Sequence, residues 1–253
     1  MLTGGFSVST SVGLRAPGHH LTHTTIHAVG QDRRGVPVDL VRRINADLDL
    51  VAAVQTGTYL GESALALRST FEEVWSIELS ESFFKSTMER HGDKAGLHFI
   101  HGDSIAVLPK ILANIDGSSL FWLDGHWSGG RTSGSDRECP VLDEIEAIDA
   151  SPHAAGSCVL VDDARLFLGP PPPPHRRSDW PTFMVVLDAL RMKYSRFVTV
   201  LEDVIIAGPP NLESTVDAYW LDRTVSRSAR KPMFGLLKAA SPTRFRTSIR
   251  SWK

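Results

Sequence analysis

The sequence predicts an α/β fold, with a doubly wound, mostly parallel, Rossmann-like sheet flanked by helices in a single domain. Two observations carry this prediction: short apolar runs alternate with segments of helical spacing, and every run ends in a glycine or an acidic residue. Ligands of open parallel sheets bind outside the carboxyl ends of the strands, so five such endings in series predict one ligand site. The runs are Leu50–Val54, Val74–Ile77, Leu97–Ile100, Leu120–Leu123 and Val159–Val161.

The composition is ordinary for a globular protein. At 253 residues, with 42% hydrophobic and 22% charged residues, the chain favours one large α/β domain over two small ones. The formal net charge of −2 gives no general attraction to nucleic acid or anionic membranes, and no apolar run approaches the roughly 20 residues that span a bilayer. No signal-like segment begins the chain, and Cys139 and Cys158 make no disulfide framework. We therefore expect a cytoplasmic protein without nucleic-acid or membrane partners.

Three segments are distinguished along the chain. Residues 1–36 show little periodicity and predict an irregular N-terminal arm, or a segment that contacts a partner such as the second copy in a homodimer. Its histidines, which include His19, His20, His23 and His27, have no zinc-site spacing and read as solvated side chains. Residues 37–222 form the predicted α/β domain. Residues 223–253 are a basic tail, read as a solvated surface or as a contact for an anionic partner.

Helical periodicity fills the stretches between the apolar runs. Pro37 and Pro181 suit the first turn of a helix, and Ser80 suits a helix start with Glu81 in the first turn. Two late apolar runs predict further strands, with an antiparallel edge as one arrangement. The predicted helices are Pro37–Ala46, Glu62–Thr70, Ser80–His91, Ile105–Asn114, Pro140–Ala150 and about Pro181–Tyr194, and the late strands are Phe197–Leu201 and Asp203–Ala207.

A run of five prolines follows the fifth predicted strand. Residues 169–174 read Gly-Pro-Pro-Pro-Pro-Pro and predict an extended polyproline segment. Because this segment comes soon after Asp162 and Asp163, it is expected to lie over the site as a stiff loop. The alternative is an inert surface spacer.

The first strand ends in a glycine loop, residues 55–63. Gly57 permits a tight turn and a close approach of the backbone to a ligand, and Gly61 begins the next helix. Tyr59 stands where the dinucleotide pattern needs its middle glycine, which counts against a nicotinamide cofactor and suits one without a pyrophosphate. Glu78, 21 residues beyond Gly57, stands where an acid accepts both hydroxyls of a ribose. Asp103 is placed to meet an adenine amino group or a neighbouring donor.

These features resemble the cofactor signature of class I S-adenosylmethionine-dependent methyltransferases over roughly Asp47–Ala207. The glycine loop resembles that of macrocin-type small-molecule O-methyltransferases. It departs at Gln55, where that family usually has an acid, and a neutral amide attracts the ammonium group of the cofactor less. The remaining alternative is a structural turn with no ligand. The resemblance implies S-adenosylmethionine as cofactor, with contacts from Thr56, Gly57, Thr58, Tyr59, Gly61, Ser63, Glu78, Asp103, Ser104 and Asp124.

Three acids end the fourth and fifth predicted strands. Neighbouring parallel strands lie about 4.8 Å apart, so these carboxylates converge and repel one another unless a cation or proton lies between them. Metal-dependent O-methyltransferases have acids at these places, so the resemblance implies Asp124, Asp162 and Asp163 as ligands of Mg²⁺. Adjacent strand residues point to opposite faces. The last two acids therefore share an ion only if the strand has already turned, and the alternative is that one caps a helix or pairs with Arg165.

His126 is the predicted base, beside Asp124. Methyl transfer to an alcohol requires removal of the hydroxyl proton, and imidazole, with an ordinary pKa near 6.5, is mostly neutral at pH 7. The chain does not reproduce the lysine that catechol-type relatives have near this position. His126 binding a metal, or hydrogen-bonding the loop, stay as alternatives.

Taken together, the residues and the resemblance predict an S-adenosylmethionine-dependent O-methyltransferase. Its acceptor is expected to be a hydroxyl of a small molecule of sugar or natural-product type, with Mg²⁺ as a candidate assistant. Two other functions compete with this prediction. One is a binding protein that keeps the fold without the chemistry, and the other is a nicotinamide-dependent oxidoreductase.

Overall fold

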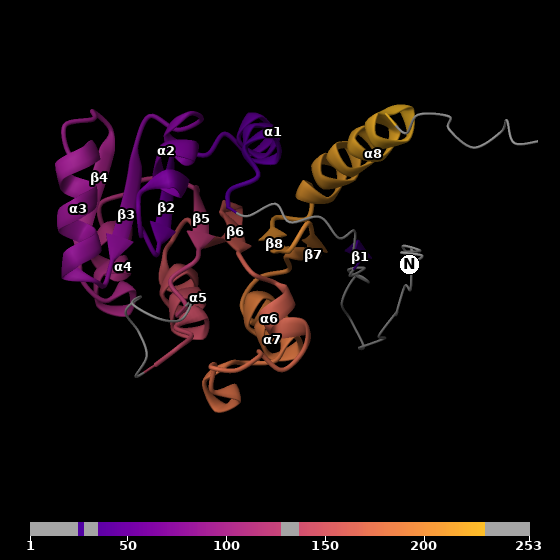
Figure 1. The fold of residues 1–253 in the computed structure, drawn as a ribbon. Helices are drawn as coiled ribbons and strands as arrows, with labels where there is room; N and C mark the ends of the chain where they lie inside the picture. Colours follow the sequence, from indigo (N-terminus) through magenta and orange to yellow (C-terminus); the bar gives the residue numbers. More distant parts are fainter. Residues whose placement is uncertain (1–24, 28–34, 128–136, 231–253) are drawn as a thin grey trace, which may run out of the picture.

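The computed structural model describes residues 25–27, 35–127 and 137–230. Their strands form one eight-stranded sheet in the order β1-β7-β8-β6-β5-β2-β3-β4, in which β8 alone runs antiparallel to its neighbours (Figure 1). This arrangement confirms the predicted α/β class. The late strands β7 and β8 pair antiparallel as expected, but they do not form the edge of the sheet, because β1 pairs with β7 on its outer side. The strands are β1 (Thr25–His27), β2 (Ala52–Thr56), β3 (Val74–Glu78), β4 (Leu97–His101), β5 (Ser119–Leu123), β6 (Cys158–Val161), β7 (Phe197–Leu201) and β8 (Val204–Gly208).

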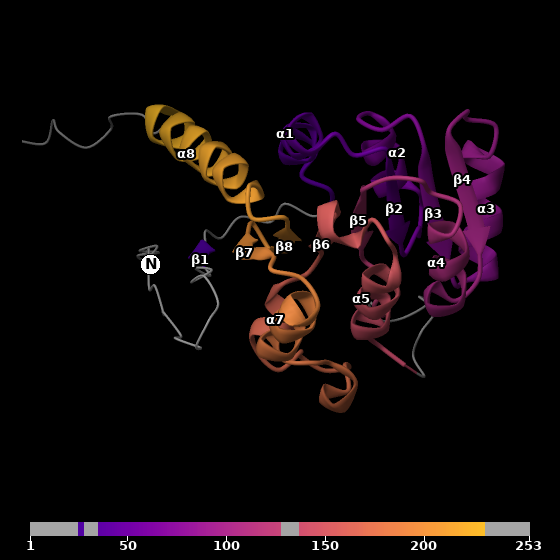
Figure 2. The ribbon, with the colours of Figure 1, turned by 180° about the vertical axis from the view of Figure 1, so that it is seen from behind.

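Helices cover both faces of the sheet (Figures 1 and 2). One apolar core joins α1, α2 and α8 to one face, and a second joins α4, α5, α6 and α7 to the other, while α3 packs beside β3 and β4. β5 serves both cores, with Trp122 on one side and Phe121 on the other. The helices are α1 (Val38–Leu48), α2 (Glu62–Arg68), α3 (Glu81–His91), α4 (Ser104–Leu112), α5 (Val141–Ala150), α6 (Arg165–Leu168), α7 (Phe183–Met192) and α8 (Leu212–Arg230), with short 3₁₀ turns η1 (Ala154–Gly156) and η2 (Arg177–Asp179).

All predicted strands and helices occur, with ends shifted by a few residues. The sequence analysis did not identify α6, α8 or β1. β1 lies inside the segment predicted as an irregular arm, and α8 continues to Arg230, inside the predicted basic tail. Residues 1–24 and 28–34 of the arm, residues 128–136 and the tail from 231 lie outside the described residues. Within the described ranges, no helix has both the length and the apolar character needed to cross a membrane.

The order of the strands fixes where a ligand site lies. From β2 the chain builds β3 and β4 on one side, and then returns to place β5 and β6 on the other side. The connections therefore diverge between β2 and β5, and a crevice opens at such a point outside the carboxyl ends of the strands. Gly57 follows β2 and Asp124 follows β5 at this crevice.

Candidate active site

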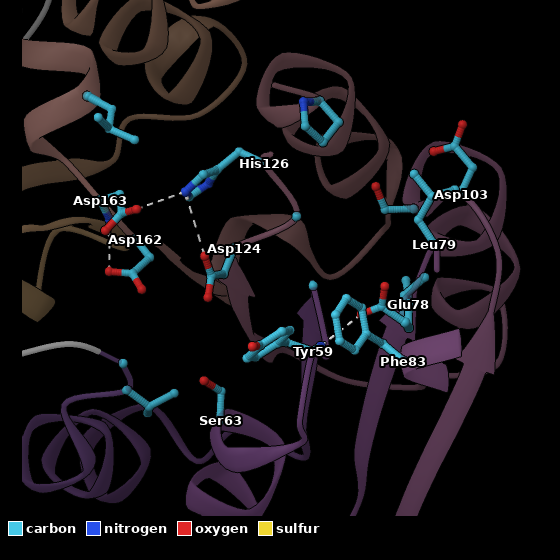
Figure 3. Close-up of a pocket in the computed structure, with 18 of the residues that line it drawn as sticks. Tyr59, Ser63, Glu78, Leu79, Phe83, Asp103, Asp124, His126, Asp162 and Asp163 are labelled. Atoms are coloured by element: carbon cyan, nitrogen blue, oxygen red, sulfur yellow. Dashed lines mark hydrogen bonds and ion pairs between the residues drawn. The ribbon is translucent and has the colours of Figure 1, made fainter. Parts of the chain in front are cut away.

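The carboxyl ends of β2 to β6 open onto one cavity of about 1120 Å³ (Figure 3). The structure therefore brings together most residues that the sequence assigned to the site. Those that line the cavity are Gly57, Tyr59, Ser63, Glu78, Asp103, Ser104, Asp124, His126, Asp162 and Asp163. Three assigned cofactor residues, Thr56, Thr58 and Gly61, do not line it.

Those three residues support the glycine loop through contacts on the side away from the cavity. Thr56 and Thr58 are buried, and the hydroxyl of Thr58 lies 2.6 Å from that of Ser76. Gly61 has a φ of +87°, and a Cβ there would lie 3.1 Å from the side chains of Thr87 and His91. They fix the shape of the loop instead of presenting side chains to the cavity.

Gly57 makes the predicted tight turn and, in addition, permits a close approach between two backbone segments. Its φ is +80°, and a Cβ built on it would lie 2.1 Å from the carbonyl oxygen of Asp124. The close approach that this glycine permits is therefore to the backbone after β5, where the Asp124 amide also donates to the Thr56 carbonyl at 3.1 Å. Contact with a ligand is not what excludes a side chain here.

Gly57→Ala is accordingly expected to destabilise the fold by about 2–4 kcal/mol, because the methyl group strains the backbone and separates β2 from β5. Urea unfolding of the variant measures this loss. Gly169→Ala is the matched control, since a Cβ there meets nothing within 4 Å. Unchanged stability in the Gly57 variant would contradict this account of the loop.

Gln55 also belongs to the framework of the loop. Its side chain is fully buried, and its Nε2 donates to the carbonyl of Gly57 at 3.0 Å. An acid at this position lacks the N–H that makes this bond. The departure from the family pattern therefore supports the turn.

Glu78 joins the glycine loop to the start of α3. Its Oε2 accepts a hydrogen bond from the Tyr59 amide at 2.8 Å, and its Oε1 accepts one from the Ser80 amide at 2.7 Å (Figure 3). Tyr59 has a φ of +47°, so this bond holds a conformation that is uncommon for a tyrosine. Each oxygen keeps a second lone pair, and the side chain lines the cavity, so the carboxylate can accept two donors from a ligand.

Apolar side chains beside Glu78 complete this end of the cavity. Leu79, Phe83 and Ile105 line it, and the ring of Phe83 meets that of Tyr59 edge to face at 4.7 Å. Asp103 also lines it and caps α4 by accepting from the Ile105 amide at 3.0 Å. The sequence analysis missed the three apolar residues. Their only signal is that each follows a strand end within a few positions.

The acids after β5 and β6 gather around one imidazole. Nε2 of His126 lies 3.1 Å from Asp163 Oδ2 and 3.7 Å from Asp124 Oδ1 (Figure 3). Asp163 has a φ of +55°, so the chain has turned after β6, and Asp162 Oδ1 accepts from the Asp163 amide at 2.8 Å. Arg165 pairs with Asp163 at 2.6 Å and also with Asp203.

Burial and neighbouring charges shift the pKa values of the acids and the imidazole in this cluster. Burial raises the pKa of Asp124 to about 7 and that of Asp162 to about 6. Burial also opposes charge on Asp163, but its hydrogen bond with His126 and the charges of His126 and Arg165 hold the pKa of that carboxyl below its ordinary value. For His126, burial disfavours the cation, yet Asp163 and Asp124 raise its pKa above 6.5. The cavity therefore holds proton-exchanging groups that titrate near neutrality.

This arrangement does not fit Mg²⁺. The guanidinium of Arg165 and Nε2 of His126 already stand beside the carboxylate of Asp163. Over the described ranges, no group of three or more His, Cys, Asp or Glu side chains is disposed to hold a metal ion. The pairing of Asp163 with Arg165, named above as the alternative, is what the structure shows.

Glu144 of α5 is a buried acid that the sequence analysis missed. It lies beneath the turn after β5, where a Cβ on Gly125 would be 3.0 Å from Glu144 Oε1 and 3.1 Å from Thr56 Oγ1. Burial raises the pKa of Glu144 to about 6. Its place on α5, facing the turn after β5 and the end of β2, leaves no signal in the sequence.

The polyproline segment forms part of the far wall. Pro172 and His175 line the cavity together with Leu166, Arg137 and Pro140. The expectation that this segment lies against the site is confirmed. It faces the end of the cavity that holds His126, away from β4 at the edge of the sheet.

Comparisons with known proteins give a likeness of fold. No family model and no curated protein matches the chain. Among solved structures, the SAH-bound methyltransferase PaMTH1 of Podospora anserina is 17% identical, with a TM-score of 0.47 over 67% of this chain and 77% of that one. A Staphylococcus aureus protein provisionally named caffeoyl-CoA O-methyltransferase is 12% identical, with a TM-score of 0.47 over 68% and 82%. An rRNA methylase of Streptococcus thermophilus is 15% identical, with a TM-score of 0.33 over 53% and 75%. Nothing about the acceptor follows from similarities this low.

Proposed function

We propose that this protein is an S-adenosylmethionine-dependent O-methyltransferase acting on a hydroxyl of a small molecule of sugar or natural-product type. One observation carries the proposal. Glu78 accepts hydrogen bonds from the backbone amides of Tyr59 in the glycine loop and of Ser80 at the start of α3. The same residue lines one cavity together with the His126 cluster. A group that accepts a ribose diol thus lies in the same chamber as groups able to take a proton.

The residues present fit such a cofactor. Glu78 would hold the ribose hydroxyls, and Leu79, Phe83 and Ile105 would hold the adenine, with Asp103 as an acceptor for its amino group. Gly57, Ser63 and Asp124 lie toward the other end, where the methionine portion belongs. When bound, the cofactor supplies an electrophilic methyl group. The protein's task is then to orient the acceptor hydroxyl and take its proton.

His126 and Asp124 are the groups that take that proton. Their side chains form one cluster with Asp163. Burial raises the pKa of Asp124 to about 7, and the neighbouring acids raise the pKa of His126 above its ordinary value in spite of its burial. Asp163 accepts from the imidazole and fixes the ring, while Arg165 balances its charge. Because the guanidinium of Arg165 already pairs with Asp163, the proposal needs no Mg²⁺.

The rival functions find less support in the site. Tyr59 stands in the cavity lining where a nicotinamide dinucleotide needs a bare backbone. Gln55, the residue that favoured an inactive binding protein, is buried in the loop and does not line the cavity. In this proposal nucleic acid and membranes are not partners, the setting is cytoplasmic, and homodimer formation is compatible with the site.

Calorimetry with S-adenosylhomocysteine tests the proposal. We expect one site per chain with a Kd below about 100 μM, equal in EDTA and in MgCl₂. Reduced nicotinamide dinucleotide is the matched probe, with the same adenosine portion and an added pyrophosphate, and it should bind at least about 10-fold more weakly. Binding of the dinucleotide but not of S-adenosylhomocysteine would overturn the proposed function.

A further inference from the structure

The polyproline segment presents an imidazole to the acceptor end of the cavity. His175 closes residues 169–175, and its side chain, 11% exposed, lines the cavity with Pro172. Its ring meets Trp180 at 5.2 Å and Trp127 at 5.4 Å, in both cases edge to face. His126 meets the same Trp180 ring at 5.2 Å. Two imidazoles therefore flank one indole on the wall of one cavity.

Glu138 holds this part of the cavity wall in place through hydrogen bonds. Its carboxylate is 2% exposed and accepts from the Arg176 amide at 2.9 Å and from Trp180 Nε1 at 2.8 Å. Its backbone carbonyl accepts from the Trp127 amide at 2.7 Å. One buried acid thus anchors the end of the polyproline segment and both tryptophans that touch His175. A segment already stiffened by prolines and anchored in this way loses little conformational freedom when a ligand binds.

The same acid orients the imidazole of His175. Nδ1 of the ring is buried and lies 3.4 Å from Glu138 Oε2. A neighbouring carboxylate favours the tautomer with the proton on that nitrogen, which leaves Nε2 with a lone pair. Because Nδ1 is buried while the side chain is 11% exposed and lines the cavity, we infer that the ring turns its other edge, with Nε2, to the cavity, where this nitrogen can accept a hydrogen bond.

We propose that His175 is an acceptor-binding residue that takes a hydrogen bond from a second hydroxyl of the acceptor. The acceptor is then a diol or polyol, with one hydroxyl beside His126 and another beside His175. This inference rests on the proposed function, because it concerns the acceptor end of that same cavity. Leu166, Pro140 and Pro172 supply the apolar contacts for the carbon skeleton between the hydroxyls.

Histidine-selective NMR tests the inference without knowledge of the natural acceptor. Protein labelled with ¹³C-histidine and saturated with S-adenosylhomocysteine is titrated with methyl α-D-glucopyranoside, and separately with 2-methoxytetrahydropyran, which keeps the ring and lacks the hydroxyls. The polyol is expected to shift the His126 and His175 resonances with one apparent affinity. The second probe should shift neither at equal concentration.

Variants separate binding from structure. His175→Phe is expected to weaken the polyol at least about fivefold while S-adenosylhomocysteine affinity stays within twofold, and His175→Gln, which keeps an accepting oxygen, should be intermediate. His153→Phe is the matched control, because His153 precedes β6 at the opposite end of the sheet and pairs with Asp116. If His175→Phe does not fold, the glutamine variant carries the same comparison.

Two results would overturn the inference while leaving the proposed function standing. One is a polyol titration that moves His126 alone or neither histidine, with S-adenosylhomocysteine bound in the same sample. The other is a His175→Phe variant that binds the polyol as tightly as the natural chain. Failure of S-adenosylhomocysteine to bind at all removes the proposed function, and the inference falls with it.

Discussion

Glu78→Ala is expected to weaken S-adenosylhomocysteine by at least about 100-fold, roughly 3 kcal/mol. The carboxylate contributes twice: it would accept the ribose hydroxyls, and it holds Tyr59 and the start of α3 through two backbone amides. Charged acceptors make the stronger hydrogen bonds, so loss of both contacts costs more than an ordinary substitution at the edge of a cavity. Calorimetry measures the change directly.

A matched pair of ligands distinguishes the ribose contact from the structural one. The natural chain should prefer S-adenosylhomocysteine to its 2′,3′-dideoxy analogue, and in Glu78→Ala the preference should vanish. Glu81→Ala removes an equal charge three residues away, from an exposed side chain that pairs with Lys85 at 2.6 Å. Its affinity should stay within about twofold. A Glu78 variant that keeps the full preference for the diol would remove this acid from the cofactor site.

The fold was predictable because local patterns agree with the tertiary arrangement. The runs of β2, β5 and β6 are buried on both faces, so they read as continuous apolar segments, and each ends where the polar crevice begins. Those endings located Gly57, Glu78 and Asp124 on one cavity. Helix α8 escaped prediction because polar residues dominate its sequence and few of its described side chains face the core: Leu212, Val216 and Tyr219 are buried there, and Trp220 packs against it.

The site was less predictable than the fold, because the spacing of residues along the sequence does not determine which way each side chain points. Thr56 and Thr58 flank the glycine at the cavity, yet both are buried: Thr56 is the last residue of the buried strand β2, and the hydroxyl of Thr58 lies 2.6 Å from that of Ser76. The cluster of acids was likewise only partly predictable from the sequence. The convergence of three carboxylates was predictable from the strand ends, but the placement of His126 and Arg165 beside them depends on turns that no spacing rule describes.

His175 and Glu138 illustrate contacts that only the folded chain creates. They are separated by 37 positions, and their relation depends on how residues 175–180 return beneath the site. The prolines predicted an extended segment near the site. Pro172 does line the cavity, but Pro173 and Pro174 form a turn, which the His175 amide closes by donating to the Pro172 carbonyl at 3.1 Å. Which residue that segment presents to the cavity was visible only in three dimensions.

The second large effect concerns proton transfer. His126→Asn is expected to lower kcat/KM for methyl transfer at least about 100-fold, because the variant loses the group that exchanges the acceptor proton. In the natural chain, kcat/KM should rise with pH through about 7 and then level off. The sign follows from the raised pKa values of Asp124 and His126: both groups hold protons at lower pH and become able to accept one as the pH increases.

Variants of the two groups should move this pH profile in opposite directions. In Asp124→Asn the imidazole loses a neighbouring negative charge, so the pKa of His126 falls and the rise in kcat/KM moves to lower pH. In His126→Asn the residual activity should rise at higher pH, because burial and the remaining acids keep the Asp124 carboxyl protonated once the imidazole is gone. NMR titration of the His126 ring gives the first shift without any acceptor. An unchanged His126 titration in Asp124→Asn would show that the two groups do not act as one unit, and the proton-accepting role would then have to be assigned to one of them alone.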